Sequence, residues 1–108
     1  MQITLTVLKV LTALLEDPLA ERYGLDLMKE TGLPSGTLYP ILARLESAGW
    51  LKAEKEMPPP IGRPRRRYYR LTAEGTIQAR LARAEALREL GEKKPSTAIP
   101  LRPQGQLA

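Results

Sequence analysis

The sequence predicts a mainly α fold with a small β-hairpin, a winged helix-turn-helix that carries an added C-terminal helix. Two short helical segments, at 23–31 and 35–48, are joined by a tight turn that contains glycine. A stretch rich in proline and arginine, at 57–67, separates two segments that alternate like strands. A long amphipathic segment follows from residue 72.

The first helix is expected from Ile3 to Glu16. Its apolar face repeats at helical spacing and consists of Leu8, Leu11 and Leu15, with Val7 and Leu14 beside them. Asp17-Pro18 ends the helix, because the residue before a proline disfavours the helical conformation. Lys9 interrupts the apolar stretch, and neither a basic flank nor a cleavage site accompanies it. We therefore expect a buried helix, no membrane span and a cytoplasmic location.

The helix-turn-helix is expected between residues 23 and 49. After a connector at 19–22, the second helix should run from Tyr23 to Thr31 and stop at Gly32. Ser35 is placed to cap the third helix. The buried stripe of that helix follows helical spacing and consists of Leu38, Ile41, Leu42 and Leu45.

Pro40 lies inside the third helix, where a proline removes one backbone hydrogen bond and clashes with the preceding turn. We therefore expect the helix to begin nearer Thr37, or its start to be bent. Ala48-Gly49 should close it, and the strand expected at Trp50–Glu56 alternates apolar and charged residues.

The predicted wing is the loop between this strand and the next one, at Tyr68–Leu71. Its prolines cannot donate to a sheet ladder, which indicates a loop or an edge. Five arginines crowd into the same segment: Arg63, Arg65, Arg66, Arg67 and Arg70. These positive charges repel one another, so a folded protein tolerates them best where a polyanion binds. The alternative is a loop whose arginines are simply solvated at the surface.

Several residues are candidates for contact with DNA. In a helix-turn-helix the second helix places its N-terminal residues in the major groove. The candidates on that helix are Ser35, Gly36, Thr37, Tyr39, Pro40 and Arg44, and those on the wing are Arg63, Arg65, Arg66 and Arg67. Two alternatives stay open: Tyr39 as a half-buried packing residue, and Arg44 as a solvated charge.

Composition excludes most enzyme chemistry. The 108 residues include no cysteine and no histidine, so disulfides, thiolate metal sites and the commonest general base are absent. No nucleophile–base constellation is present, and we expect no enzyme activity, no metal site and no cofactor. The net charge of +5 and a pI near 9.8 favour an acidic partner.

Four sequence blocks resemble the PadR family of bacterial transcriptional regulators. They lie within a similarity that spans Leu8 to Leu90 and are Tyr23-Gly24, Gly36–Glu46, Gly49–Leu51 and Gly62–Gly75. The resemblance implies a winged helix-turn-helix dimer that binds a palindromic operator and usually represses transcription. It also implies DNA contacts at Ser35, Thr37 and Tyr39, and minor-groove or backbone contacts at Arg63 to Arg67.

The last helix is expected to begin after the cap residue Thr72 and to mediate dimerisation. Together with Leu8 and Leu11, the candidate dimer residues are Ile77, Leu81, Ala84, Leu87 and Leu90. The alternative is that this helix packs over Ile3–Leu15 within one subunit, and the two arrangements are compatible. The expected organisation is a DNA-binding domain at 1–72, a dimerisation helix at 73–91 and a disordered tail at 92–108.

The leading hypothesis is a homodimeric, sequence-specific repressor whose partner is double-stranded DNA. A winged helix used only for protein–protein interaction is the alternative, and the arginine-dense wing argues against it. Larger relatives have several further helices, whereas this chain has the short form with one. Because no aromatic residue follows Tyr69, a stacking platform for a planar drug is not expected on that helix, and no effector can be named.

Overall fold

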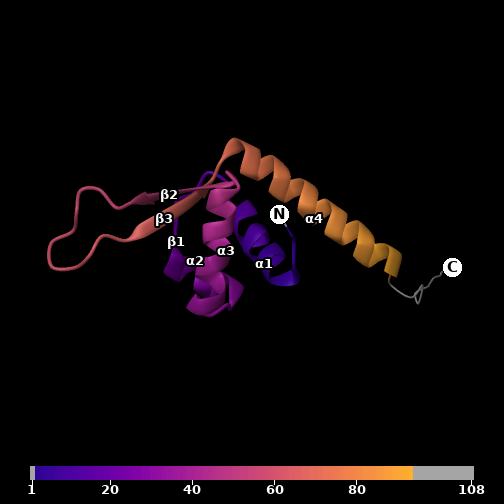
Figure 1. Ribbon diagram of the computed structural model, residues 1–108, viewed down its shortest axis with the longest axis horizontal. Helices are drawn as coiled ribbons and strands as arrows, with labels where there is room; N and C mark the ends of the chain where they lie inside the picture. The colour runs from indigo at the N-terminus through magenta and orange to yellow at the C-terminus, as the bar shows by residue number, and fades with distance from the viewer. Residues whose placement is uncertain (1, 94–108) are drawn as a thin grey trace.

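The structure is a computed structural model that describes residues 2–93, and it confirms the predicted fold class (Figure 1). The elements in chain order are α1 (Leu5–Leu15), β1 (Arg22–Tyr23), α2 (Gly24–Thr31), α3 (Ser35–Ser47), β2 (Leu51–Lys55), β3 (Arg67–Leu71) and α4 (Ala73–Lys93). The expected tail at 92–108 differs at its start, because α4 continues to Lys93. The rest of that tail lies outside the described residues.

The strands form one antiparallel sheet in the order β1-β3-β2, so the predicted hairpin gains a third strand. Tyr23 of β1 pairs with Tyr68 of β3, and Ala53 of β2 pairs with Tyr69. The two residues of β1 are too few to show an alternating pattern in the sequence. Gly24 then starts α2 directly, which places the N-terminus of α2 beside the wing.

The core is built from the predicted apolar stripes of α1 and α3. Leu38, Ile41, Leu42 and Leu45 are all buried, as are Val7, Val10, Leu11, Leu14 and Leu15. Thr4 caps α1 by accepting a hydrogen bond from the Val7 N–H at 3.2 Å. Leu8 differs from the expectation of a buried face, since it is only half-buried.

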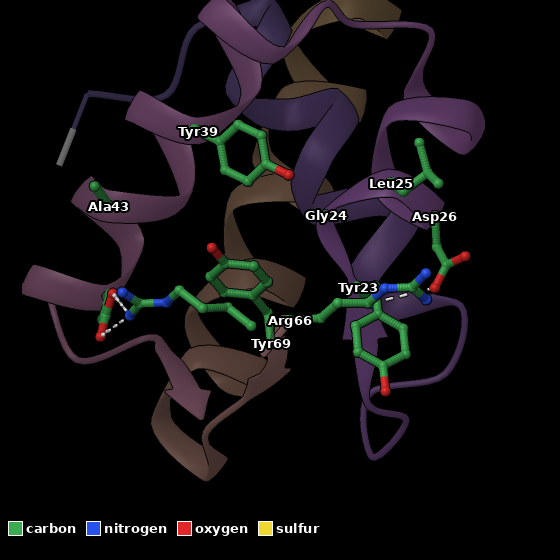
Figure 2. A pocket seen from close by; sticks show the side chains of 10 residues that line it. Tyr23, Gly24, Leu25, Asp26, Tyr39, Ala43, Arg66 and Tyr69 are labelled. Carbon is green, nitrogen blue, oxygen red and sulfur yellow. Dashed lines mark hydrogen bonds and ion pairs between the residues drawn. The ribbon is translucent and has the colours of Figure 1, made fainter. Parts of the chain in front are cut away.

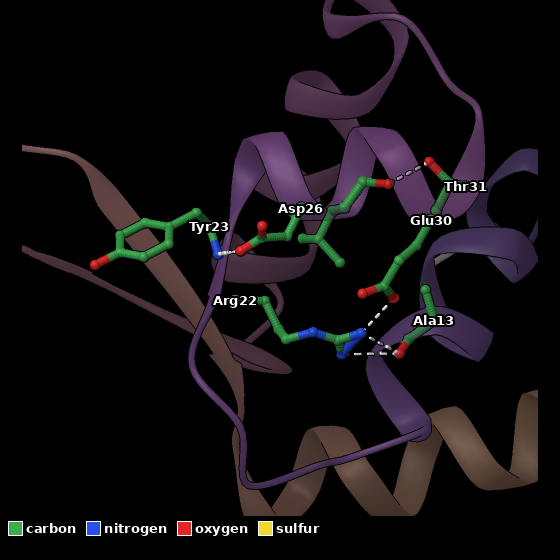
Figure 3. A network of polar contacts seen from close by, with 7 residues as sticks. Ala13, Arg22, Tyr23, Asp26, Glu30 and Thr31 are labelled. Carbon is green, nitrogen blue, oxygen red and sulfur yellow. Dashed lines mark hydrogen bonds and ion pairs between the residues drawn. The ribbon is translucent and has the colours of Figure 1, made fainter.

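Arg22 joins three elements in a network of polar contacts (Figure 3). Its side chain is 11% exposed, and its two terminal nitrogens donate to the Ala13 carbonyl oxygen at 3.0 and 3.1 Å. Its guanidinium also forms an ion pair with the Glu30 carboxylate. Because a buried guanidinium needs both charge and hydrogen-bond partners, this network holds β1 against α1 and α2.

The prediction that Ser35 caps α3 is wrong. The cap is Pro34, whose extended backbone turns its carbonyl toward α3, where it accepts from the Thr37 N–H at 3.0 Å and the Leu38 N–H at 2.9 Å. Ser35 is therefore the first helical residue. The expectation of a start nearer Thr37 is also wrong, because the helix begins at Ser35 and includes Pro40 on its exposed side.

The start of α4 is tightly packed on the turn that follows α3. Thr72 is the predicted cap, and its hydroxyl accepts from the Gly75 N–H at 2.9 Å while donating to the Gly49 carbonyl oxygen at 2.7 Å. A Cβ on Gly75 would lie 1.8 Å from the Trp50 carbonyl oxygen. Glycine is required here because only a residue without a side chain allows this approach.

Helix α4 packs on α1 through its small residues. Ala79 is completely buried, and Ala82 packs against the core. The predicted leucine and isoleucine stripe faces outward instead: Ile77, Leu81, Leu87 and Leu90 are between 57% and 62% exposed. Helix α4 therefore packs over α1 as the alternative expected, but mainly through its alanines, and most of the leucine and isoleucine stripe stays exposed. None of the helices in the described part of the chain has the length and apolarity needed to cross a membrane.

Candidate nucleic-acid interface

Helix α3 presents a surface that is neutral over its N-terminal half, with Arg44 near its C-terminal end. Ser35, Gly36, Pro40 and Arg44 are exposed, and Thr37 is half-buried. The opposite face of the same helix carries the buried core stripe. The amphipathic pattern therefore turns the predicted contact residues toward solvent and fixes the orientation of the helix that carries them.

Tyr39 is partly exposed and also packs against α2, so the packing role expected from the sequence applies, while its contact with DNA stays a prediction. Its side chain is 42% exposed, yet its phenol ring lies against the backbone of α2. A Cβ on Gly24 would lie 2.2 Å from the Tyr39 hydroxyl oxygen. Gly24 thus provides the space in which the ring packs, and the other side of the ring remains available to a ligand.

The wing arginines divide into two pairs according to their partners. Arg63 donates from both terminal nitrogens to the two oxygens of Glu56, each at 2.9 Å. Arg67 donates more weakly to the two oxygens of Glu46 on α3, at 3.4 Å. Arg65 and Arg66 form no ion pair with any residue between 2 and 93. These last two are therefore the wing guanidinium groups best placed to meet an external anion.

The guanidinium of Arg66 rests on an aromatic support. It lies 5.7 Å from the centre of the Tyr23 ring, a distance at which the π face attracts a cation. Tyr23 in turn meets Tyr68 edge to face, with ring centres 6.2 Å apart. Neither Tyr23 nor Tyr68 was predicted as a site residue from the sequence, although both occur in the blocks that resemble the PadR family.

A cleft of about 540 Å³ lies between α3, the start of α2 and the base of the wing (Figure 2). It is lined by Tyr23, Gly24, Leu25, Asp26, Tyr39, Ala43, Glu46, Arg66, Arg67 and Tyr69. The structure thus brings Tyr39, Arg66 and Arg67 together. Arg44 is not among them, since it borders a separate hollow beside Gln2 and Thr4.

Tyr69 forms part of the cleft wall and is only 5% exposed. Its hydroxyl makes no hydrogen bond to another residue in the described part of the chain. Burial raises the pKa of this phenol above its ordinary value, so the hydroxyl stays protonated at neutral pH. The cleft therefore offers a neutral hydroxyl beside the Arg67–Glu46 pair.

Carboxylates on β2 and at its end are held in the charged form by their partners. The Tyr68 hydroxyl donates to Glu54 at 3.0 Å and lowers the pKa of that carboxyl. The hydrogen bonds from Arg63 likewise lower the pKa of Glu56. Glu56 was not predicted as a site residue, although its position in the sequence, an acid between a strand and a basic loop, could have indicated it.

The site can bind an anion but offers little for catalysis. Within residues 2–93 no group of three carboxylate, histidine or cysteine side chains is placed to hold a metal ion. What the surface does provide is exposed hydroxyls on a helix and free guanidinium groups on a neighbouring loop. This combination suits a phosphate backbone and base edges.

Comparison with known families gives one match. The model described as the transcriptional regulator PadR-like family matches residues 10–81, which is more than half of the chain. The matched range runs from α1 through the wing and into the first part of α4. No curated protein matches the chain.

Solved structures of similar proteins agree with this match. A PadR family transcriptional regulator from Eggerthella lenta DSM 2243 is 35% identical, covers 80% of this chain and 71% of its own, and has a TM-score of 0.60. A PadR-like transcription factor from Bacteroides fragilis is 28% identical with a TM-score of 0.64, over 80% of this chain and 82% of its own. A PadR family regulator from Clostridium difficile R20291 is 24% identical, over 82% and 97% of the two chains, and supports the fold with a TM-score of 0.65.

Proposed function

Because the chain belongs to the PadR-like family of transcriptional regulators, which are DNA-binding proteins and not enzymes, we propose that it is a dimeric repressor of transcription. Each protomer would place α3 in the major groove of one half of a palindromic operator, with the two half-sites about 34–36 Å apart. The wing would lie over the adjacent backbone or minor groove. A protein that binds an operator would be located with the DNA, in the cytoplasm.

One observation carries this proposal. Tyr39, Ala43 and Glu46 of α3 line the same cleft as Arg66 and Arg67 of the wing. Tyr39 belongs to α3 and Arg66 belongs to the wing, and both line that cleft. A duplex that touches the helix would therefore also meet the wing. For this reason we assign DNA contacts to both elements.

The outward face of α4 supports dimerisation. Ile77, Leu81, Leu87 and Leu90 are each more than half exposed on one helix, and large exposed apolar surfaces often mark protein interfaces. Leu8 and Leu90 border a shared hollow between α1 and the far end of α4, so Leu8 can join the same interface. Leu11 has no exposed surface, and we therefore leave its side chain out of the proposed contact.

Selection of bound fragments from random duplex DNA tests this function most directly. The expected result is a palindromic motif whose two halves are separated by one helical turn or a multiple of it. The mass of the complex in solution should correspond to two copies of the chain on one site. Recovery of fragments without any shared motif, at a monomer mass, would contradict the proposal.

A further inference from the structure

An acidic residue stands at the base of the arginine-rich wing. Glu56 follows the last residue of β2, and its carboxylate faces the loop rather than solvent alone, with 22% of the side chain exposed. The loop between β2 and β3 projects far from the sheet, on the side away from the end of α4 (Figure 1). A loop of this reach has no core of its own to fix its shape.

Glu56 contacts this loop at two separate points. The carboxylate accepts both terminal nitrogens of Arg63 at 2.9 Å, which is the bidentate geometry that makes such pairs strong. The same carboxylate accepts the Arg66 N–H at 3.4 Å. The Glu56 N–H donates to the Arg66 carbonyl oxygen at 2.8 Å and adds a backbone bond below the loop. One residue thus joins the strand end to positions 63 and 66.

This arrangement determines which charges the wing presents. Arg63 is neutralised by its partner, so its guanidinium is occupied. Arg66 is held through its backbone on both sides, while its guanidinium stays free of any described carboxylate and rests over the Tyr23 ring. Glu56 therefore restrains the loop by binding the guanidinium of Arg63. The guanidinium groups of Arg65 and Arg66 stay free to bind an external anion.

We propose that Glu56 is a positioning residue for DNA binding: as an acid within a basic wing, it raises affinity for DNA by fixing the loop that carries Arg65 and Arg66. The inference rests on the proposed function. It also opposes the simplest electrostatic expectation, in which any carboxylate near a polyanion weakens binding.

The test compares three neutralising substitutions in the full chain. Glu56→Gln should weaken binding to the selected operator about threefold, because exposed ion pairs contribute modestly and the loop becomes less ordered. Glu54→Gln is the matched control, since it removes the same charge two residues away and keeps an acceptor for Tyr68. Glu54→Gln should leave affinity unchanged or slightly tighter.

Arg63→Gln provides the sign test. If charge alone mattered, Glu56→Gln would tighten binding and Arg63→Gln would weaken it. If the pair positions the loop, both changes weaken binding, and the double variant is no weaker than the Arg63→Gln single variant. The inference would be overturned if Glu56→Gln bound DNA more tightly than the unmodified chain. It would also be overturned if Glu56→Gln and Arg63→Gln had effects of opposite sign that simply added in the double variant.

A second measurement does not depend on DNA. Amide hydrogen exchange at Glu56 and Arg66, followed by NMR on the free protein, should be faster in Glu56→Gln and unchanged in Glu54→Gln. Unchanged exchange at both amides would overturn the inference even if DNA affinity fell. If the unmodified chain bound no duplex, the proposed function would fail and the affinity claim with it, while the exchange result would still decide whether Glu56 orders the loop.

Discussion

Helix α3 and the wing are held in shape by opposite means. In α3 a continuous stripe of buried side chains fixes the helix, and the exposed face can then carry neutral, short groups. The wing loop has almost no buried side chain, and ion pairs with Glu56 and Glu46 take the place of a core. The two elements should therefore be sensitive to different substitutions: α3 to loss of buried side chains, and the wing to loss of charge.

The largest expected effect concerns packing in α3. Leu45→Ala should lower the free energy of unfolding by about 2–5 kcal/mol, because Leu45 is fully buried and its truncation leaves a cavity. Ile61→Ala, in the wing loop, should change it by less than about 0.5 kcal/mol, since Ile61 is completely exposed. Urea denaturation followed by circular dichroism measures both. Equal losses would break the contrast between the two elements.

The next effect concerns the charges of the wing. The double variant Arg65→Ala/Arg66→Ala should bind all duplexes about tenfold more weakly, and the slope of log affinity against log salt should fall by about two per protomer. Arg80→Ala/Arg88→Ala, on α4 and away from the cleft, is a control with the same change of charge. Fluorescence anisotropy over a range of salt concentrations gives both values. An unchanged slope in the wing variant would remove the wing from the interface.

A smaller effect should distinguish base recognition by α3 from sequence-independent electrostatic attraction by the wing. Thr37→Ala should change preference between operator variants, by about 1 kcal/mol per altered base pair, with little change in the salt slope. The wing variant should behave in the opposite way, with a lower slope and unchanged preference. Competition binding with a panel of operator variants makes the comparison. If Thr37→Ala weakened every sequence equally, its role would be backbone contact.

The smallest effect concerns pH. Because the Arg63 hydrogen bonds lower the pKa of Glu56, the contribution of this pair to wing order is complete above about pH 4.3, the ordinary glutamate value. It should be lost only as the pH falls through the lower pKa of the folded state. NMR titration of the side-chain carboxyl carbon measures this, and Arg63→Gln should move the pKa of Glu56 back upward. A normal value in the unmodified chain would argue against the pair.

The sequence predicted the elements with strong periodicity. The stripe from Leu38 to Leu45 was identified because leucine and isoleucine repeat at helical spacing, and Thr72 was identified because a hydroxyl residue precedes a long helix. β1 was missed, since Arg22 and Tyr23 form a strand only through pairing with β3. The Ser35 cap was wrong because residue type favoured serine, while the extended backbone of Pro34 decided the boundary.

The partners of charged side chains were beyond the sequence. Four arginines of the wing look equivalent in the chain, and only the structure shows that Arg63 and Arg67 have carboxylate partners. The orientation of α4 was equally undetermined, because its alanines and its leucines form two possible faces. The alanine face allows the closer approach to α1, which leaves the larger side chains outside. The contacts of α3 and of the wing with DNA remain predictions.

The glycine at position 75 has a consequence for the geometry of an assembled pair. Since α4 seats directly on the Trp50 carbonyl, its direction is set by the same turn that ends α3. In the proposed dimer joined through α4, this contact would restrict the angle between α4 and α3. The distance between the two copies of α3, and with it the spacing of the operator halves, would then depend on the absence of a side chain at position 75.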